Sequence, residues 1–267
     1  MSSRSTDELS AMTWQEAQRR LTQRPIGFLP IGAIEAHGPH LPLDTDILIA
    51  CATAHRVVER LQNLGFPVLI LPAIPFSVSF AGTSFAGTTP ADPDPFEAYL
   101  TSVLINAGPQ GYRAIVCCNA HLEPAHIERV GRACVSASDR IGIPILFPDQ
   151  RSERFSSYLS DEFRAGARHA GSYETSILLA SDARLVRQDA LTGLPPVWID
   201  LPARLQAGAR TFLEAGAELG YFGDPASATP KEGHRMLDAL ADIIEVALRE
   251  AGVLPAGVVS QVRSLTD

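Results

Sequence analysis

Short apolar runs alternate with longer stretches of helical periodicity over most of the chain. Four of the apolar runs are short, as is typical of buried strands. They lie at residues 26–31, 68–71, 114–118 and 143–147. Because helical spacing follows the first run and a second apolar run comes after it, the pattern predicts β-loop-α-β organisation in an α/β fold.

Helices are predicted between and after these strands. The first begins at a capping box formed by Thr13 and Glu16 and ends near Leu21. Another begins at Pro124, and the rest are expected at residues 47–64, 95–107, 151–163, 173–180, 202–219 and 231–250. We find no linker, low-complexity tract or domain break, so residues 1–267 are expected to form a single domain.

Side chains that can bind metal ions gather after the first strand. They are Glu35, His37, His40, Asp44 and Asp46. Glu35 and His37 are two residues apart, which places both on one side of an extended chain. Asp46 returns from the far end of the same proline-restricted loop. Mixed carboxylate and imidazole ligands suit zinc or manganese.

The strand at residues 114–118 ends in the same way, because a histidine and an acid two residues apart follow it directly. If the two strands are parallel neighbours, their loops open on the same edge of the sheet, so the two sets of ligands can converge. The converging set is Glu35, His37, Asp46, His121 and Glu123. Five ligands exceed what one tetrahedral zinc ion with an open position needs, and they suit two metals bridged by a carboxylate.

Some of these polar side chains also fit purely structural roles. Asp44 and Asp46 stand where they can cap the next helix, so the first loop could be only a polar turn. Beyond Pro124 we interpret four further side chains as a solvated helix face rather than as ligands. These are His126, Glu128, Arg129 and Arg132.

His169 precedes a glycine-hinged entry to the helix at residues 173–180. A histidine there titrates near neutrality, and Glu174 is close enough in sequence to orient or charge it. We therefore interpret His169 as a candidate acid or base in catalysis. The alternative is that it only caps the helix.

Two further segments each have two interpretations. The motif SFAGT occurs twice in tandem over residues 79–88, and its small residues form either a pocket-lining loop or a flexible surface loop. Residues 185–219 are rich in proline and alanine and are interpreted as a lid or a subunit contact.

Composition narrows the class of partner. The net charge of -8 and the pI near 5.4 argue against nucleic acid or an anionic membrane, so we expect a small-molecule or peptide substrate. No signal peptide or apolar stretch of transmembrane length is found, which predicts a soluble, cytoplasmic protein. The four cysteines form no CxxC motif and are interpreted as buried thiols.

Four segments together resemble the creatininase (creatinine amidohydrolase) family, in the family's order. They read LPIGAIEAHGPHLPLDTD, CNAHLE, HAGSYETS and GYFGDPASATPKEG and span residues 29–233. The resemblance implies a three-layer α/β/α sandwich around a mostly parallel sheet, assembled as a homohexamer. It also implies two divalent metal ions, zinc or zinc with manganese.

Carried over residue by residue, the resemblance assigns each ligand to a metal. One metal takes Glu35 and His121, the other takes His37 and Glu123, and Asp46 bridges both. His169 matches the family's proton-transfer histidine. Glu174 matches the acid of the family's H-x(4)-E segment, in which four residues separate the histidine from the acid.

The implied activity is metal-dependent hydrolysis of a carbon–nitrogen bond other than a peptide bond, in a small cyclic amide or a formamide. Creatinine itself is not expected, because the family's creatinine-cleaving members hold the ring between tryptophans, and neither Trp14 nor Trp198 lies in a matching segment. The alternatives are a peptidase, a lactone or cyclic-ketone hydrolase, and a non-catalytic small-molecule-binding protein.

Overall fold

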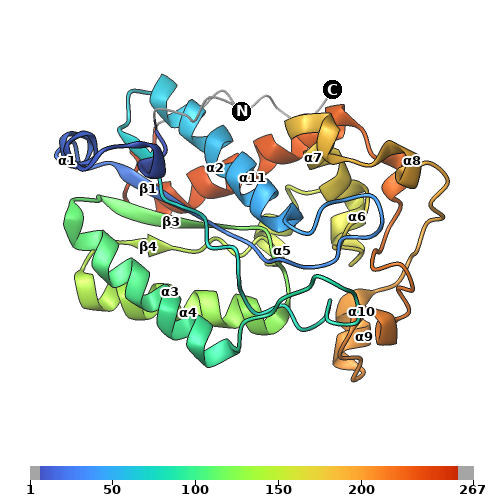
Figure 1. Ribbon diagram of the computed structural model, residues 1–267. Coiled ribbons are helices and arrows are strands. Elements are labelled where there is room, and N and C mark those ends of the chain that lie inside the picture. The colour runs from blue at the N-terminus through green and yellow to red at the C-terminus, as the bar shows by residue number, and fades with distance from the viewer. Residues whose placement is uncertain (1–6, 258–267) are drawn as a thin grey trace.

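A parallel four-stranded sheet lies at the centre of the protein (Figure 1). The computed structural model describes residues 7–257. The strands stand in the order β2-β1-β3-β4, and all neighbouring pairs are parallel. Their bounds are β1 Ile26–Ile31, β2 Val68–Ile70, β3 Ala114–Asn119 and β4 Ile145–Leu146.

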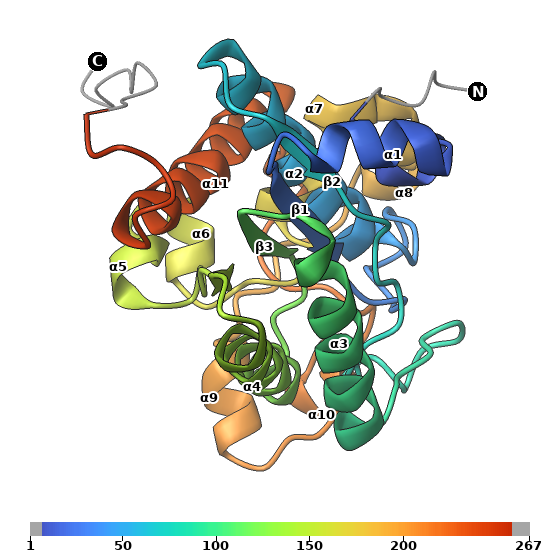
Figure 2. The same ribbon diagram turned by 90° about the vertical axis from the view of Figure 1, so that its left-hand side faces the viewer.

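Helices cover both faces of this sheet, as Figures 1 and 2 show from two sides. The long ones are α2 Thr45–Asn63, α3 Pro93–Ala107, α4 Pro124–Ile141 and α11 Pro230–Glu250. Along β1, Phe28 packs in the core with α2 and α11, whereas Leu29 packs in the core with α3 and α4. Successive side chains of a strand point to opposite faces, so the apolar run at 26–31 serves both layers. The expected three-layer α/β/α fold is confirmed.

Shorter helices complete the chain. They are α1 Trp14–Leu21, α5 Glu153–Ser156, α6 Asp161–Arg164, α7 Ser172–Asp182, α8 Gln188–Leu191, α9 Leu201–Gln206 and α10 Phe212–Ala215. Four 3₁₀ turns lie at Leu9–Ala11, Gly108–Gln110, Ala183–Leu185 and Pro225–Ser227. The predicted capping box opens α1, because Thr13 accepts from the Glu16 N–H while the Glu16 side chain accepts from the Thr13 N–H.

Two long helices predicted from the sequence are wrong. Residues 151–163 form α5 and α6 instead of one helix, since the Ser160 hydroxyl accepts the Phe163 N–H and starts a new helix there. Residues 202–219 form α9 and α10, because Gly208 adopts a left-handed φ of 104° after the end of α9.

Helix α7 reaches the site because it packs closely on α11. A Cβ at Gly233 in α11 would lie 1.8 Å from the Ser176 carbonyl oxygen in α7, so only glycine permits this approach. The contact brings the first turn of α7, which carries Glu174, toward the carboxyl ends of β1 and β3.

The cysteines behave as expected for core thiols. Cys117, Cys118 and Cys134 are buried, Cys51 is half-buried, and all are free. Cys117 Sγ lies 3.5 Å from Cys134 Sγ between β3 and α4. Among residues 7–257, no helix combines the length and apolarity needed to cross a membrane.

Candidate metal centre

The ligand loops converge because β1 and β3 are parallel neighbours in register. Ile31 at the end of β1 pairs with Asn119 at the end of β3, so the chain leaves both strands at one edge of the sheet. Glu35 and His37 follow β1, and His121 follows β3. Asp46 enters from the first turn of α2, which begins two residues earlier than predicted. The structure brings these four side chains together, whereas the predicted set of five also included Glu123.

Glu35, Asp46 and His121 form one compact group of buried side chains. The Nδ1 atom of His121 lies 3.1 Å from Glu35 Oε1 and 3.1 Å from Asp46 Oδ2. Two carboxylate oxygens and one imidazole nitrogen at this spacing make a mixed donor set of the kind that zinc and manganese accept.

His37, Asp46 and Glu174 form a second group. His37 Nε2 lies 3.3 Å from Asp46 Oδ1 and 3.7 Å from Glu174 Oε2. Asp46 offers Oδ2 to the first group and Oδ1 to the second, so one carboxylate joins the two sets of donors.

The tautomers of three histidines follow from their backbone partners. A carbonyl oxygen can only accept, so the ring nitrogen that contacts it must carry the proton. His37 donates through Nδ1 to the Glu35 carbonyl, His121 through Nε2 to the Val78 carbonyl, and His169 through Nε2 to the Ala36 carbonyl. In each neutral ring the other nitrogen presents a lone pair to the site. Histidine ligands of metals are held in this way.

The buried carboxylates stabilise positive charge on the neighbouring histidines. Burial alone would lower the pKa of His37, but Asp46, Glu174 and Glu35 together raise it to about 10. Burial likewise opposes the charged form of His121, yet Glu35 and Asp46 raise its pKa well above the ordinary value. Without a hydrogen-bond partner, His37 Nε2 and Asp46 Oδ2 are buried at the centre of the group. Bound cations would satisfy these atoms and offset the negative charge.

His169 lies beside the two groups rather than capping α7. Its Nδ1 atom is 3.6 Å from Glu35 Oε1, and it forms a third set of possible ligands with Glu35 and His37. Burial, and then the positive charge of His37, lower the pKa of His169 to about 4, so its ring is neutral near pH 7. The Phe212 ring packs on it with 4.1 Å between ring centroids. Its role in proton transfer stays a prediction.

Glu123 lies at the edge of the site and in none of the three groups found among the described residues. Its carboxylate accepts the Ala81 N–H at 3.0 Å, and burial raises its pKa. Glu174 occupies the place beside His37 that the family resemblance gave to Glu123. The carboxylate of Glu174 is buried, which contributes most to raising its pKa to about 8, and it accepts the Ala170 N–H.

His126 is not on a solvated face, so that interpretation is wrong for this residue, whereas Glu128 and Arg132 are exposed as predicted. Its ring is fully buried, and Nε2 contacts Asn119 Oδ1 at 2.8 Å. It packs edge-on against the His121 ring with 4.8 Å between centroids. His40 also turns away from the three groups and contacts the Thr175 hydroxyl at 2.9 Å.

The tandem SFAGT segment contributes to the site through its first copy. The buried Ser79 hydroxyl donates to Glu35 Oε2 at 2.6 Å and so orients that carboxylate. Ala81 lines the cavity and donates to Glu123. The pocket-lining interpretation therefore holds for this copy. Nothing in the pattern distinguished Ser79 from Ser84, since only the tertiary structure brings one of them to Glu35.

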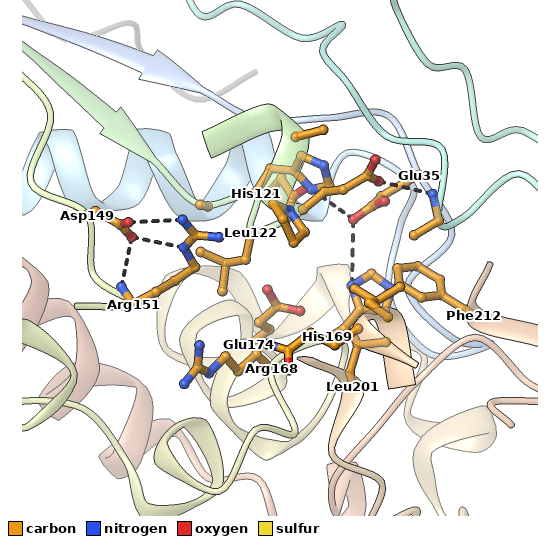
Figure 3. A pocket seen from close by; sticks show the side chains of 18 of the residues that line it. Glu35, His121, Leu122, Asp149, Arg151, Arg168, His169, Glu174, Leu201 and Phe212 are labelled. Carbon is orange, nitrogen blue, oxygen red and sulfur yellow. Dashed lines mark hydrogen bonds and ion pairs between the residues drawn. The ribbon is translucent and has the colours of Figure 1, made fainter. Parts of the chain in front are cut away.

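A cavity of about 720 Å³ opens onto the site (Figure 3). In Figure 3, Glu35, His121 and His169 lie away from Arg151 and Arg168, and Glu174 lies between Glu35 and Arg168. Leu201 and Phe212, from the proline- and alanine-rich segment, close the wall beside His169. Phe212 and Arg168 were missed by sequence reasoning, because neither lies in a spacing that points to chemistry.

Comparisons with known proteins identify the family. The family described as creatininase, creatinine amidohydrolase, matches residues 10–248. A mycofactocin precursor peptide peptidase from Mycobacterium tuberculosis is 33% identical over 227 residues, which cover 80% of each chain. The protein of that name from Mycolicibacterium smegmatis is 30% identical and covers 83% of this chain and 85% of its own. A creatinine amidohydrolase from Pseudomonas putida is 25% identical over 90% of this chain and 95% of its own.

Solved structures show the same fold. A creatininase described as the Mn form superposes with a TM-score of 0.69 at 22% identity, covering 92% of this chain and 98% of its own. A second creatinine amidohydrolase structure gives 0.68 at 23% identity over 91% and 97% of the chains. This chain belongs to the creatininase family. It is a hydrolase that acts on carbon–nitrogen bonds.

Proposed function

We propose that the protein hydrolyses an amide bond with the help of two divalent metal ions. Glu35, Asp46 and His121 would hold one ion, and His37, Asp46 and Glu174 would hold the other. The observation that carries the proposal is the shared Asp46 carboxylate, whose two oxygens face two separate groups of buried donors. Each donor set has two carboxylates and one imidazole, so zinc or manganese suits either site.

When bound, such ions lower the pKa of water and polarise a carbonyl group. The chain's own residues set the geometry around them. Ser79 holds Glu35 by a hydrogen bond, and the Ala170 N–H holds Glu174. The backbone carbonyls fix the imidazole rings of His37 and His121.

His169 is suited to move a proton between the nucleophilic water and the departing nitrogen. Its Nε2–H is committed to the Ala36 carbonyl, so Nδ1 is the atom that can accept a proton and return it. The ring is neutral near pH 7, which is the form that accepts one. An amide nitrogen needs this proton, because it would otherwise leave as a strongly basic anion.

We favour the amide bond of a short peptide over a single small ring. The cavity of about 720 Å³ lies within the range that encloses drug-sized ligands. Relatives at 33% and 30% identity are named as peptide peptidases. Trp14 and Trp198 are exposed and do not line the cavity, so the ring sandwich of creatinine-cleaving members has no counterpart here. Assembly as a homohexamer stays a prediction from the family resemblance, and a cytoplasmic location stays a prediction from the sequence.

Metal analysis of matched variants tests the proposal. The wild-type protein is expected to bind about two equivalents of zinc per chain, and Asp46→Asn is expected to lose most of both. Asp44→Asn is the control, because Asp44 lies in the same loop but makes no side-chain cap to α2. It should keep both ions.

Activity is then measured with the zinc- or manganese-loaded protein on short peptides, lactams and formamides. Metal-dependent release of amine from any of these supports the proposal, and faster cleavage of peptides supports the preferred substrate. Two bound ions without cleavage of any amide would overturn it in favour of a binding protein. A single equivalent in the wild type would remove the two-metal arrangement.

A further inference from the structure

The cavity has arginine side chains on the side away from Glu35 and His121. In Figure 3, Arg151 lies beside Asp149 and Arg168 lies below it near Glu174, both away from Glu35. Leu122 and Leu201 also line the cavity, so the space that separates the two polar sides is partly apolar. A substrate that spans this space meets catalytic groups at one end and a guanidinium at the other.

Three arginines line the cavity, and they differ in how their charge is balanced; Arg210 is paired with Glu214 at 3.8 Å. Arg151 is paired with Asp149 through two side-chain contacts, Nε to Oδ1 at 3.1 Å and Nη2 to Oδ2 at 3.0 Å. That fork is the geometry in which a carboxylate satisfies a guanidinium. Arg151 therefore has little unsatisfied charge to offer a ligand.

Arg168 makes no ion pair with any acid in the described part of the chain. Its Nε atom donates to the Phe163 carbonyl at 2.8 Å, and its guanidinium carbon lies 4.8 Å from the centre of the Phe163 ring. These contacts hold the plane of the guanidinium in place and occupy only one of its donors. Asp200 and Asp149 act on it only at longer range.

The surroundings of Arg168 make an added negative charge favourable. The residue is half-buried, and burial together with the nearby charge of Arg151 lowers its pKa from the ordinary value. An arginine remains charged under these conditions, so the unfavourable free energy of its partly buried charge persists until an anion binds. A carboxylate is the anion whose shape matches the two free amino groups of a held guanidinium.

We propose that Arg168 binds a carboxylate of the substrate and thereby selects short peptides that end in a free carboxyl group close to the cleaved bond. This inference rests on the proposed amide hydrolysis. It adds a specificity-determining residue on the side of the cavity away from Glu35 and His121.

The test compares two pools of tripeptides that share their sequences and differ only at the C-terminus, as free acids or as amides. The metal-loaded wild type is expected to cleave the acid pool with the higher kcat/KM. In Arg168→Gln the ratio of acid to amide kcat/KM should fall on the order of 10- to 100-fold, with most of the change in KM, as expected for a lost charged hydrogen bond. Arg168→Lys should restore part of the ratio, because it keeps the charge but not the fork.

Arg113→Gln is the matched control. Arg113 is exposed and precedes β3, at the edge of the sheet away from the site. The ratio of acid to amide kcat/KM in Arg113→Gln should therefore equal that of the wild type. An equal kcat/KM for both pools in the wild type, or an unchanged ratio in Arg168→Gln, would overturn the inference and leave the proposed hydrolysis intact.

Calorimetric titration of the same peptides separates the two proposals. If neither pool is cleaved, tighter binding of the acid pool by the wild type than by Arg168→Gln still supports the carboxylate site. Equal binding by the two proteins would overturn it. Failure of cleavage alone counts against the proposed function only.

Discussion

The chemistry of the site depends on which nitrogen of each histidine carries the proton. His37, His121 and His169 each commit one ring nitrogen to a backbone carbonyl, so the lone pair of the other is aimed at the site. The same contacts distinguish two kinds of histidine. His37 and His121 each contact two or more carboxylates. His169 contacts a single carboxylate, that of Glu35, among the described residues, and its pKa is lowered.

Replacing His169 should therefore separate turnover from metal binding. We expect His169→Ala to lower kcat by roughly 10²- to 10⁴-fold, the usual contribution of a general acid or base. Its zinc content should remain near that of the wild type by mass spectrometry. His234→Ala is the control, since His234 is exposed on α11. Loss of one ion from His169→Ala would instead identify His169 as a ligand.

Ser79 gives a second test at the scale of a single hydroxyl. Ser79→Ala removes the hydrogen bond to Glu35 Oε2, and we expect metal affinity to fall about 10- to 100-fold, as for other residues that orient a ligand. Ser84→Ala is the matched control, because Ser84 holds the same place in the second SFAGT copy and is exposed. Competition with a zinc chelator measures the metal affinity of both variants. Equal affinities would show that Glu35 needs no support from Ser79.

At the scale of elements, the approach of α2 to the end of β1 determines where Asp46 stands. A Cβ at Gly32 would lie 2.6 Å from the Ile47 nitrogen and 2.7 Å from the Asp46 carbonyl carbon. Both are backbone atoms, so a side chain there cannot be accommodated by a rotamer change.

Gly32→Ala should push the start of α2 away from the strand. We expect a loss of about 1–3 kcal/mol in the free energy of unfolding from overpacking, together with weaker metal binding. Gly131→Ala in α4 is the control, since its added Cβ would meet only the Phe147 ring at 3.9 Å. Urea denaturation and zinc titration measure the two effects. Wild-type metal affinity in Gly32→Ala would show that Asp46 is positioned by other contacts.

The sequence predicted those elements whose signals are local. The apolar run at 26–31, the Thr13 capping box and the final helix match the structure because each depends on neighbours in the chain. The helices expected at 151–163 and 202–219 failed because a serine cap and a left-handed glycine interrupt patterns that otherwise resemble long helices. The convergence of the two strand ends could be predicted once parallel pairing was assumed.

Contacts made by tertiary structure alone could not be predicted in this way. The contact of Ser79 with Glu35, the place of Arg168 in the cavity and the inward turn of His126 depend on how distant segments pack. Glu174 stood out by its spacing from His169, but its position beside His37 comes from the packing of α7 on α11.

At the scale of the whole molecule, metal binding and folding should be coupled. The candidate ligands place several buried charges in the interior, and cations that bind only the folded form stabilise it by mass action. At a free zinc concentration 100 times the dissociation constant, one site adds about 2.7 kcal/mol. For a chain of this size we expect the melting temperature to rise by about 5–10 °C over the chelator-treated protein.

Differential scanning fluorimetry with and without a chelator measures this shift. Calcium, which prefers sites with more oxygen ligands, is the control ion and should give little change. A melting temperature that does not respond to zinc would mean that the negative charges of the carboxylates are balanced by protonated imidazoles and need no metal ion.

The candidate ligands are spread along the chain from Glu35 to Glu174, and the second group is incomplete until α7 has packed on α11, the helix that ends at Glu250. A ribosome-bound chain would therefore have to release the residues up to the end of α11 before that group could form. Under the proposed two-metal arrangement, capture of the second ion would follow the synthesis of α11, and products truncated before this helix would lack that ion.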